Sequence, residues 1–246
     1  QHYFPKYAHH ATRIATVSEF SKRDIIRQYG IAEDKIDVVY NGANEDFAPI
    51  PQKKIENTRS QYSDGKPYFF FIGALHPRKN LVRLFDAYDA FRENSDTDIK
   101  LVVAGEKKWW TASIRKAYEQ MKHKDEVFFP GRLNAGELHK VLASALALTY
   151  VSYFEGFGIP IVEAFRCRVP VITSNVTSMP EVAGDAALLT DPFDIDSIAD
   201  AMRQVAYSEE LRKELTDRGA LRMQEFTWQK SSERLWRTIE KATQNQ

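Results

Sequence analysis

Short apolar runs alternate with amphipathic stretches along nearly the whole chain, and this alternation constrains the fold more than any other feature. The apolar runs predict strands over residues 13–17, 36–40, 68–72, 100–104, 127–129, 145–150, 171–173 and 187–189. The amphipathic stretches predict helices over residues 19–29, 81–94, 111–122, 135–143, 160–166, 195–207, 209–225 and 228–242. Short strands joined by helices are typical of βαβ units. The sequence therefore predicts an α/β protein with a Rossmann-like parallel sheet and helices on both faces.

The composition changes along the chain and suggests a division into parts. Residues 45–66 are polar and contain Pro49, Pro51 and Gly65, which is typical of a linker. Residues 67–226 have enough strands and helices for a complete domain. Residues 1–44 have only two strands and one helix, too few for a core of their own. We therefore predict that 1–44 is the trailing part of another domain whose beginning is absent, and that 227–246 is a final helix.

Charge and cysteine content exclude several classes of protein. The 34 Lys and Arg balance the 34 Asp and Glu, which argues against a nucleic-acid binder that works through bulk charge. The single cysteine, Cys167, excludes a disulfide framework, and no Cys/His spacing indicates zinc. No apolar run approaches the length of a membrane span, and residues 1–10 lack the apolar run of a secretory signal. We expect a soluble cytoplasmic protein.

The first unusual turn follows the predicted strand 68–72. Ligands of open parallel sheets bind beyond the carboxyl ends of the strands, so residues in such turns are candidates for a site. Gly73 permits close approach of the backbone, and Arg78 and Lys79 place two cations just before the next helix. Cations beside free helix N–H groups favour an anion, above all a phosphate. Taken alone, the Arg-Lys pair is more often just a solvated surface turn.

The second unusual turn, residues 154–160, contains two glycines between a strand and a helix. The backbone amides of Phe157, Gly158 and Ile159 can point at a ligand here without steric obstruction. The start of the helix, with Pro160 in its first turn, adds a positive partial charge of about half a unit. A diphosphate suits this position.

Two glutamates flank the glycines. Glu155 precedes them, and Glu163 falls in the first turn of the helix. A carboxylate can accept hydrogen bonds from both hydroxyls of a cis-diol such as that of ribose. Singly, each glutamate is more often structural; Glu163 alone would stabilise the helix start by about 0.3–1 kcal/mol. Their combination with the glycines is hard to explain by packing.

Two further turns lie at the same predicted edge, at Gly105-Glu106 and at Gly131-Arg132-Leu133. They could hold a base or another phosphate, although a glycine after a strand is most often only a turn.

With these residues in view, the chain resembles the group-one family of retaining glycosyltransferases with the two-Rossmann GT-B fold. Residues 155–164 match the Glu-x7-Glu signature of that family, and residues 169–173, 179–192 and 226–228 are also similar to it. Two positions depart from the pattern. Many relatives have Gly-Arg-Leu where this chain has Gly73-Ala74-Leu75, and Gly-x-Pro where it has Arg168-Val169-Pro170.

The resemblance implies a role for each candidate residue. Arg78 and Lys79 would bind the donor diphosphate, Glu155 would contact hydroxyls of the transferred sugar, and Glu163 would hold the ribose diol. Gly73 and the amides of the second turn would also contact the donor, and Arg132 and Leu133 would lie near the base. The resemblance implies no cofactor, because the nucleotide-diphospho-sugar is itself the donor substrate. It also implies no metal, because members of the family usually need none at the donor site.

The resemblance also implies an organisation and a reaction. Residues 1–44 would end the acceptor-binding domain, 67–226 would form the donor half of a GT-B enzyme, and 227–246 would cross back to the absent domain. The implied reaction is retaining transfer of a hexose to a glycan or lipid-linked acceptor bound by that absent domain. This piece does not itself indicate membrane contact, and any association with the inner membrane would belong to the absent domain. Residues 77–81 resemble bacterial mannosyltransferases, which favours GDP-mannose, and this piece alone is expected to be inactive.

Other functions remain as alternatives. A non-catalytic sugar-nucleotide-binding module would use the same residues. A dinucleotide-dependent dehydrogenase would need Gly-x-Gly-x-x-Gly after the first strand of its sheet, which the turn after 68–72 lacks. A metal-dependent sugar transferase would use Asp-x-Asp, and Asp194-Ile-Asp196 fits that string. It precedes a predicted helix, however, so an aspartate cap is the simpler account.

Overall fold

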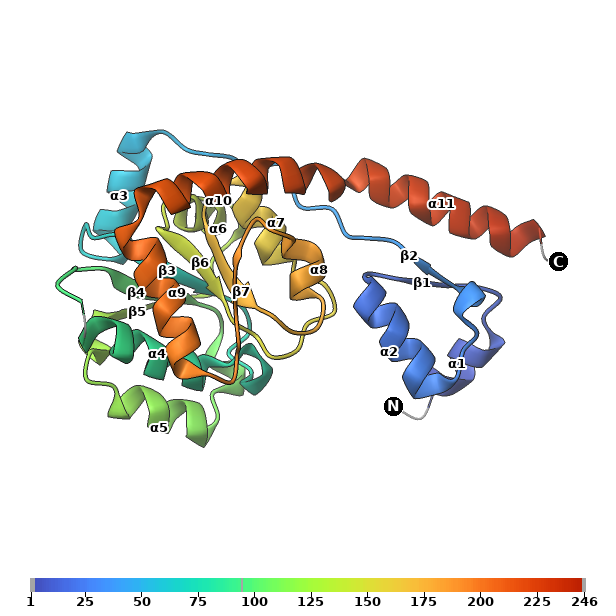
Figure 1. Cartoon of the computed structure of the whole chain (residues 1–246), viewed down its shortest axis with the longest axis horizontal. Helices are drawn as coiled ribbons and strands as arrows, with labels where there is room; N and C mark the ends of the chain where they lie inside the picture. Colours follow the sequence, from blue (N-terminus) through green and yellow to red (C-terminus); the bar gives the residue numbers. More distant parts are fainter. Residues whose placement is uncertain (1–2, 94, 245–246) are drawn as a thin grey trace.

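A six-stranded parallel sheet organises the larger part of the chain in the computed structural model, which describes residues 3–93 and 95–244 (Figure 1). Its strands are β3 (Tyr68–Ile72), β4 (Lys100–Ala104), β5 (Val127–Gly131), β6 (Ala147–Tyr150), β7 (Val171–Ser174) and β8 (Leu188–Thr190). They lie in the order β5-β4-β3-β6-β7-β8, all parallel to their neighbours. The order reverses between β3 and β6, and such a reversal opens a crevice at the carboxyl ends of the strands.

Helices cover both faces of this sheet, as predicted. The described α-helices are α1 (Phe4–His10), α2 (Glu19–Tyr29), α3 (Gln52–Tyr62), α4 (Leu81–Glu93), α5 (Ala112–Gln120), α6 (Ala135–Ala143), α7 (Ile159–Arg166), α8 (Met179–Ala183), α9 (Ile195–Tyr207), α10 (Glu209–Arg222) and α11 (Trp228–Gln244). In β3, Tyr68 and Phe70 pack in a core with residues of α6, α7 and α8, while Phe69 and Phe71 pack in another with residues of α4, α5 and α9. Alternate side chains of one strand thus supply two cores.

Local signals located several helix ends correctly. The Ser18 side chain accepts a hydrogen bond from the Ser21 N–H at the start of α2, and left-handed Gly30 ends that helix. Asn134 and Glu137 form a reciprocal capping box at α6. Asp194 accepts from the Asp196 N–H at the start of α9, so Asp194-Ile-Asp196 is a helix start.

The linker prediction for residues 45–66 misses a helix. Residues 52–62 form α3, where Thr58 is buried and Arg59 Nε donates to the Ser144 carbonyl at 3.0 Å. The stretch is too polar for its amphipathic pattern to stand out, so tertiary packing decides its conformation. Apart from the short 3₁₀ turns, α1 was also not predicted, and for α8 only a helix start at Ser178 was predicted, without a range.

The spacing of Ser178 and Glu181 predicts a capping box, which the structure does not form. The two carboxylate oxygens of Glu181 accept hydrogen bonds from the backbone N–H groups of Glu19 and Phe20, at 2.7 and 3.0 Å. The carboxylate therefore caps α2, which lies far away in the sequence. Burial and the hydrogen bond with Glu181 raise the pKa of Tyr40 to about 12.

The segment before α3 forms a small unit of its own. Strands β1 (Ile14–Thr16) and β2 (Ile36–Val38) pair in parallel beside α2, and α11 extends from the main sheet to this unit (Figure 1). Lys241 Nζ lies 2.6 Å from Asp37 Oδ1, and the Arg234 guanidinium lies over the Tyr40 ring. Residues 1–2, the last residue of the predicted helix 81–94, and residues 245–246 of the predicted final segment lie outside the described residues.

No helix among residues 3–93 and 95–244 is long and apolar enough to cross a membrane.

Candidate functional site

The turn after β3 is held in place by Asn80. Pro77, Arg78 and Lys79 form a short 3₁₀ helix, which ends at Asn80 in the left-handed conformation with φ of 63°. The Asn80 side-chain amide donates to the carbonyls of Val151, at 3.0 Å, and Pro192, at 2.7 Å. The turn is therefore tied to the end of β6 and to the loop after β8, which aims both cations at the crevice. Sequence analysis missed Asn80 as a positioning residue.

The two predicted cations meet the predicted carboxylate. Glu155 Oε1 lies 2.7 Å from Arg78 Nη1 and 2.6 Å from Lys79 Nζ, and the Lys79 ammonium also donates to the Tyr150 hydroxyl at 2.6 Å. Lys79 and Glu155 are buried, whereas the Arg78 side chain is 40% exposed. The sequence did not reveal this ion cluster, which carries one positive charge in excess.

Burial and ion pairing act against each other in this cluster. Burial alone would raise the pKa of Glu155, but the adjacent Lys79 and Arg78 outweigh it and hold that pKa below its usual range. Burial lowers the pKa of Lys79, and the contact with Glu155 offsets only part of the effect. Glu155 is therefore held ionised between the cations, with the Tyr150 hydroxyl beside it.

The glycine-rich turn before α7 presents its amides to the crevice. The buried Ser178 hydroxyl lies 2.9 Å from the carbonyls of both Glu155 and Phe157, and the Ser18 hydroxyl donates to the Gly156 carbonyl at 2.6 Å. In a trans peptide, the N–H points opposite the preceding carbonyl. The N–H groups of Phe157 and Gly158 thus point away from these serines, and the first N–H groups of a helix have no intrahelical partner.

A cavity of about 510 Å³ collects most of the predicted site residues. It lies where the strand order reverses, between the ends of β3 and β6. Its lining includes Gly73, Lys79, Glu155, Phe157, Gly158, Ile159 and Glu163. Arg78 is not part of the lining and reaches the site through Glu155. The ring of Phe157 packs between Tyr40 and Phe226, so this residue offers the cavity its backbone only.

Glu163 is in a different state from Glu155. The prediction that it falls in the first helical turn is wrong, because α7 begins at Ile159 and Glu163 is its fifth residue, in the second turn. Burial raises the pKa of Glu163 to about 7. No other described residue forms an ion pair with it, so a substantial fraction of Glu163 is protonated at neutral pH.

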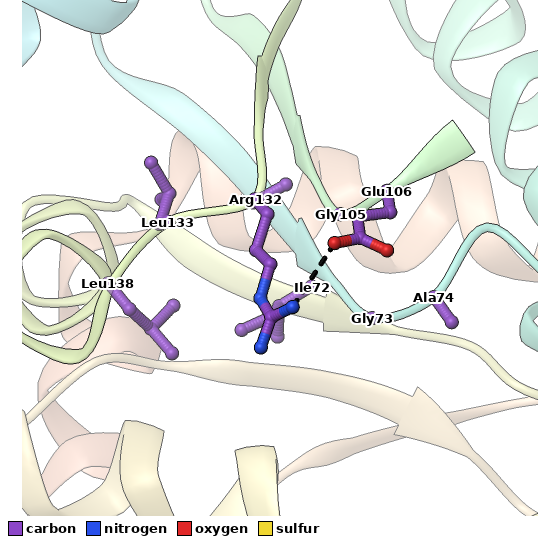
Figure 2. Close-up of a pocket in the computed structure, with 9 residues that line it drawn as sticks. Ile72, Gly73, Ala74, Gly105, Glu106, Arg132, Leu133 and Leu138 are labelled. Atoms are coloured by element: carbon purple, nitrogen blue, oxygen red, sulfur yellow. Dashed lines mark hydrogen bonds and ion pairs between the residues drawn. The ribbon is translucent and has the colours of Figure 1, made fainter. Parts of the chain in front are cut away.

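Arg132 and Leu133 line a second cavity, of about 270 Å³, which shares Ile72, Gly73 and Leu138 with the first (Figure 2). The two cavities form a continuous candidate site, with a charged end at Glu155 and a mostly apolar end near Leu133. Among the lining residues that the sequence did not assign to the site, two are polar, Asn41 and Tyr150. Asn41 brings the segment before α3 to the cavity. The Asn41-Gly42 dipeptide was the sequence signal that could have indicated this residue.

Within residues 3–93 and 95–244, no group of three or more His, Cys, Asp and Glu is arranged to hold a metal ion. The expectation of a metal-free donor site stays a prediction.

Comparison with known proteins identifies the family. The model for glycosyl transferases group 1 matches residues 52–222, so the chain belongs to this family. The model for Glycosyltransferase Family 4 matches residues 1–47. The two matches meet in the stretch that precedes α3.

Two curated relatives are mannosyltransferases by name. The chain is 32% identical over 220 residues to O-antigen chain mannosyltransferase B of Escherichia coli, covering 89% of this chain and 58% of the relative. It is 32% identical over 193 residues to O-antigen chain mannosyltransferase RfbU of Salmonella typhimurium, covering 78% and 50%. The chain thus spans about half the length of these relatives.

Solved structures show the same fold. A glycosyltransferase from Rickettsia africae superposes with a TM-score of 0.85 at 17% identity, over all of this chain and 68% of that one. Anabaena HepE, in complex with UDP and glucose, superposes with a TM-score of 0.84 at 18% identity, over 95% and 64%. The fold is that of the GT-B glycosyltransferases.

Proposed function

We propose that this chain binds the nucleotide-diphospho-sugar donor of a retaining hexosyltransferase. The observation that carries the proposal is that Lys79 and the free amides before α7 meet at one cavity at the reversal of strand order, with Arg78 paired to Glu155 at its edge. Preorganised cations and N–H groups stabilise charge that develops on a leaving diphosphate. Family membership supports the same conclusion.

Each residue has a part in the proposed reaction. Arg78 and Lys79, with the amides of the glycine-rich turn, would hold the diphosphate and stabilise its charge as the sugar leaves. The second carboxylate oxygen of Glu155 would accept from a sugar hydroxyl, and Glu163 would accept from the ribose diol. Retention by front-face attack would let the leaving phosphate take the acceptor proton.

The proposed donor is GDP-mannose, and the proposed acceptor is a glycan or a lipid-linked sugar. Two relatives that are 32% identical are named as O-antigen chain mannosyltransferases, which supports both assignments. The acceptor would be bound with the help of a further domain, at the cytoplasmic side of the inner membrane.

Calorimetric titration with GDP, UDP and ADP tests donor binding. We expect at least one of these diphosphates to bind, and Arg78→Ala to weaken that binding about tenfold or more, with the larger loss at low salt. The exposed Arg115 on α5 offers a matched control, because Arg115→Ala removes a cation that does not line the cavity. Equal affinity of the wild type and Arg78→Ala would remove the assignment of the diphosphate to this cluster.

A further inference from the structure

The smaller cavity has the dimensions of a site for one flat ring. Its volume of about 270 Å³ lies below the range of about 300–1,000 Å³ that is typical of pockets for whole drug-sized ligands. Gly105 forms part of its floor with φ of 154°, and a Cβ there would lie 1.9 Å from the Gly73 carbonyl oxygen. Glycine is therefore needed at position 105 to let the turn after β4 pack on the turn after β3, and Gly73 and Gly105 leave part of the cavity lining without side chains.

Only two polar side chains line this cavity in the described chain, Glu106 and Arg132. The other lining residues are aliphatic or glycine: Ile72, Gly73, Ala74, Ala104, Gly105, Leu133 and Leu138. If side-chain hydrogen bonds distinguish one planar ring from another in this cavity, Glu106 and Arg132 must form them. Figure 2 shows the Arg132 side chain reaching from the turn after β5 toward Glu106, which follows β4.

The pair has hydrogen-bonding capacity to spare. Arg132 Nη1 donates to Glu106 Oε1 at 3.2 Å, and no other described side chain bonds to either group. Both side chains are well exposed, at 80% for Arg132 and 50% for Glu106. One carboxylate oxygen and most guanidinium N–H groups are thus available at the rim of the cavity.

We propose that Glu106 and Arg132 select guanine, so that the donor is a guanosine diphosphate sugar. The inference rests on the proposed function, since it places the base of the bound donor in this cavity. Guanine presents an acceptor, O6, beside two donors, N1–H and the 2-amino group. Arg132 supplies only donors and Glu106 only acceptors. Arg132 can therefore donate to O6 while the Glu106 carboxylate accepts from N1–H and the 2-amino group.

Other bases match the pair less well. Uracil has a single N–H between two carbonyl oxygens, so one of those oxygens would face the Glu106 carboxylate without a proton between them. Adenine has an amino group but no N1–H, so it offers the carboxylate one donor fewer. A site built to hydrogen-bond a group discriminates against an analogue that lacks it, because its own polar groups are left unpaired.

Titration calorimetry with GDP, inosine diphosphate, UDP and ADP tests this selection. Inosine diphosphate differs from GDP only in lacking the 2-amino group. The wild type should bind GDP about 10–100-fold more tightly than UDP, and about tenfold more tightly than inosine diphosphate. Glu106→Gln should remove the preference for GDP over inosine diphosphate, and Arg132→Ala should lower GDP affinity about tenfold. The exposed Glu119 of α5 provides the control Glu119→Gln, which should change nothing.

The possible outcomes distinguish a failure of this inference from a failure of the proposed function. If GDP, UDP and ADP bind with equal affinity, or if Glu106→Gln keeps the wild-type ratio of GDP to inosine diphosphate, the selection by Glu106 is wrong and donor binding stands. If none of the diphosphates binds, the proposed function fails and the inference fails with it.

Discussion

Lys79 Nζ lies 2.6 Å from Glu155 Oε1 in a buried setting, although 76 residues separate the segments that supply them. The contact joins the turn after β3 to the glycine-rich turn before α7 across the reversal of strand order. It fixes one cation and one carboxylate at the same end of the cavity. The pair therefore contributes both to the local structure and to the proposed diphosphate site.

The first prediction concerns the coupling of this pair. Lys79→Met should lower the free energy of unfolding by up to about 3 kcal/mol, because it leaves a buried carboxylate with Arg78 as its one remaining cation. Glu155→Gln combined with Lys79→Met should cost less than the sum of the single changes, by about 1–3 kcal/mol. Urea denaturation of the four proteins in the cycle measures the difference. Additive costs would mean that the two groups do not stabilise each other.

Arg78→Ala serves as the contrast in the same experiment. Its side chain is 40% exposed, so the loss in stability should be no more than about 1 kcal/mol, while nucleotide affinity falls. A loss as large as that of Lys79→Met would contradict the distinction between the two cations.

The second prediction concerns pH. Burial raises the pKa of Glu163 to about 7 in the folded protein, above its ordinary value of 4.5. Between these values the folded state binds more protons than the unfolded state, so the contribution of Glu163 to stability falls as the pH rises. Relative to Glu163→Gln, the wild type should lose up to about 3 kcal/mol between pH 4.5 and 8. Denaturation at both pH values measures this, and parallel curves for the two proteins would disprove it.

The third prediction concerns the ribose. If Glu163 accepts from both hydroxyls, its ionised form is favoured in the complex, so nucleotide binding near pH 6 should release protons. Calorimetry in buffers of different ionisation enthalpy detects that release, and Glu163→Gln should abolish it. The 2′,3′-dideoxy nucleotide is the control and should bind without the release. A nucleotide and its dideoxy analogue with equal affinities would exclude the diol contact.

The fourth prediction concerns the turn into β7. Arg168 adopts the left-handed conformation, with φ of 57°, which glycine adopts more readily than any other residue. Its Nη1 lies 3.3 Å from Asp217 Oδ1 in an exposed ion pair of little value. Arg168→Gly should raise the free energy of unfolding by about 0.5–1 kcal/mol, since glycine adopts this conformation without a Cβ penalty.

Arg168→Ala separates conformation from charge, because it removes the same ion pair and retains the Cβ. In thermal unfolding, the midpoint of Arg168→Gly should be higher than that of Arg168→Ala. The reverse order would show that left-handed strain does not matter at this turn.

Much of the sheet follows from local sequence. The apolar runs at β3 and β4 match the observed strands residue for residue, because strands that are buried on both faces need side chains that are apolar throughout. Ser18 and Asn134 mark the starts of α2 and α6, since a cap acts within three residues of itself. The glycines and charges at strand ends indicated the edge at which the candidate site lies.

Tertiary structure decided what local signals could not. Polar residues 52–62 become α3 because α6 offers a surface for them to pack on. Glu181 caps α2 from 162 residues away, although its spacing from Ser178 predicts a local capping box. The meeting of Lys79 with Glu155 depends on the order of the strands, and strand order arises from packing of the whole chain. Sequence alone thus determined which residue types stand at the edge of the sheet; only the fold determined which of them touch, because contact depends on distance in space and not along the chain.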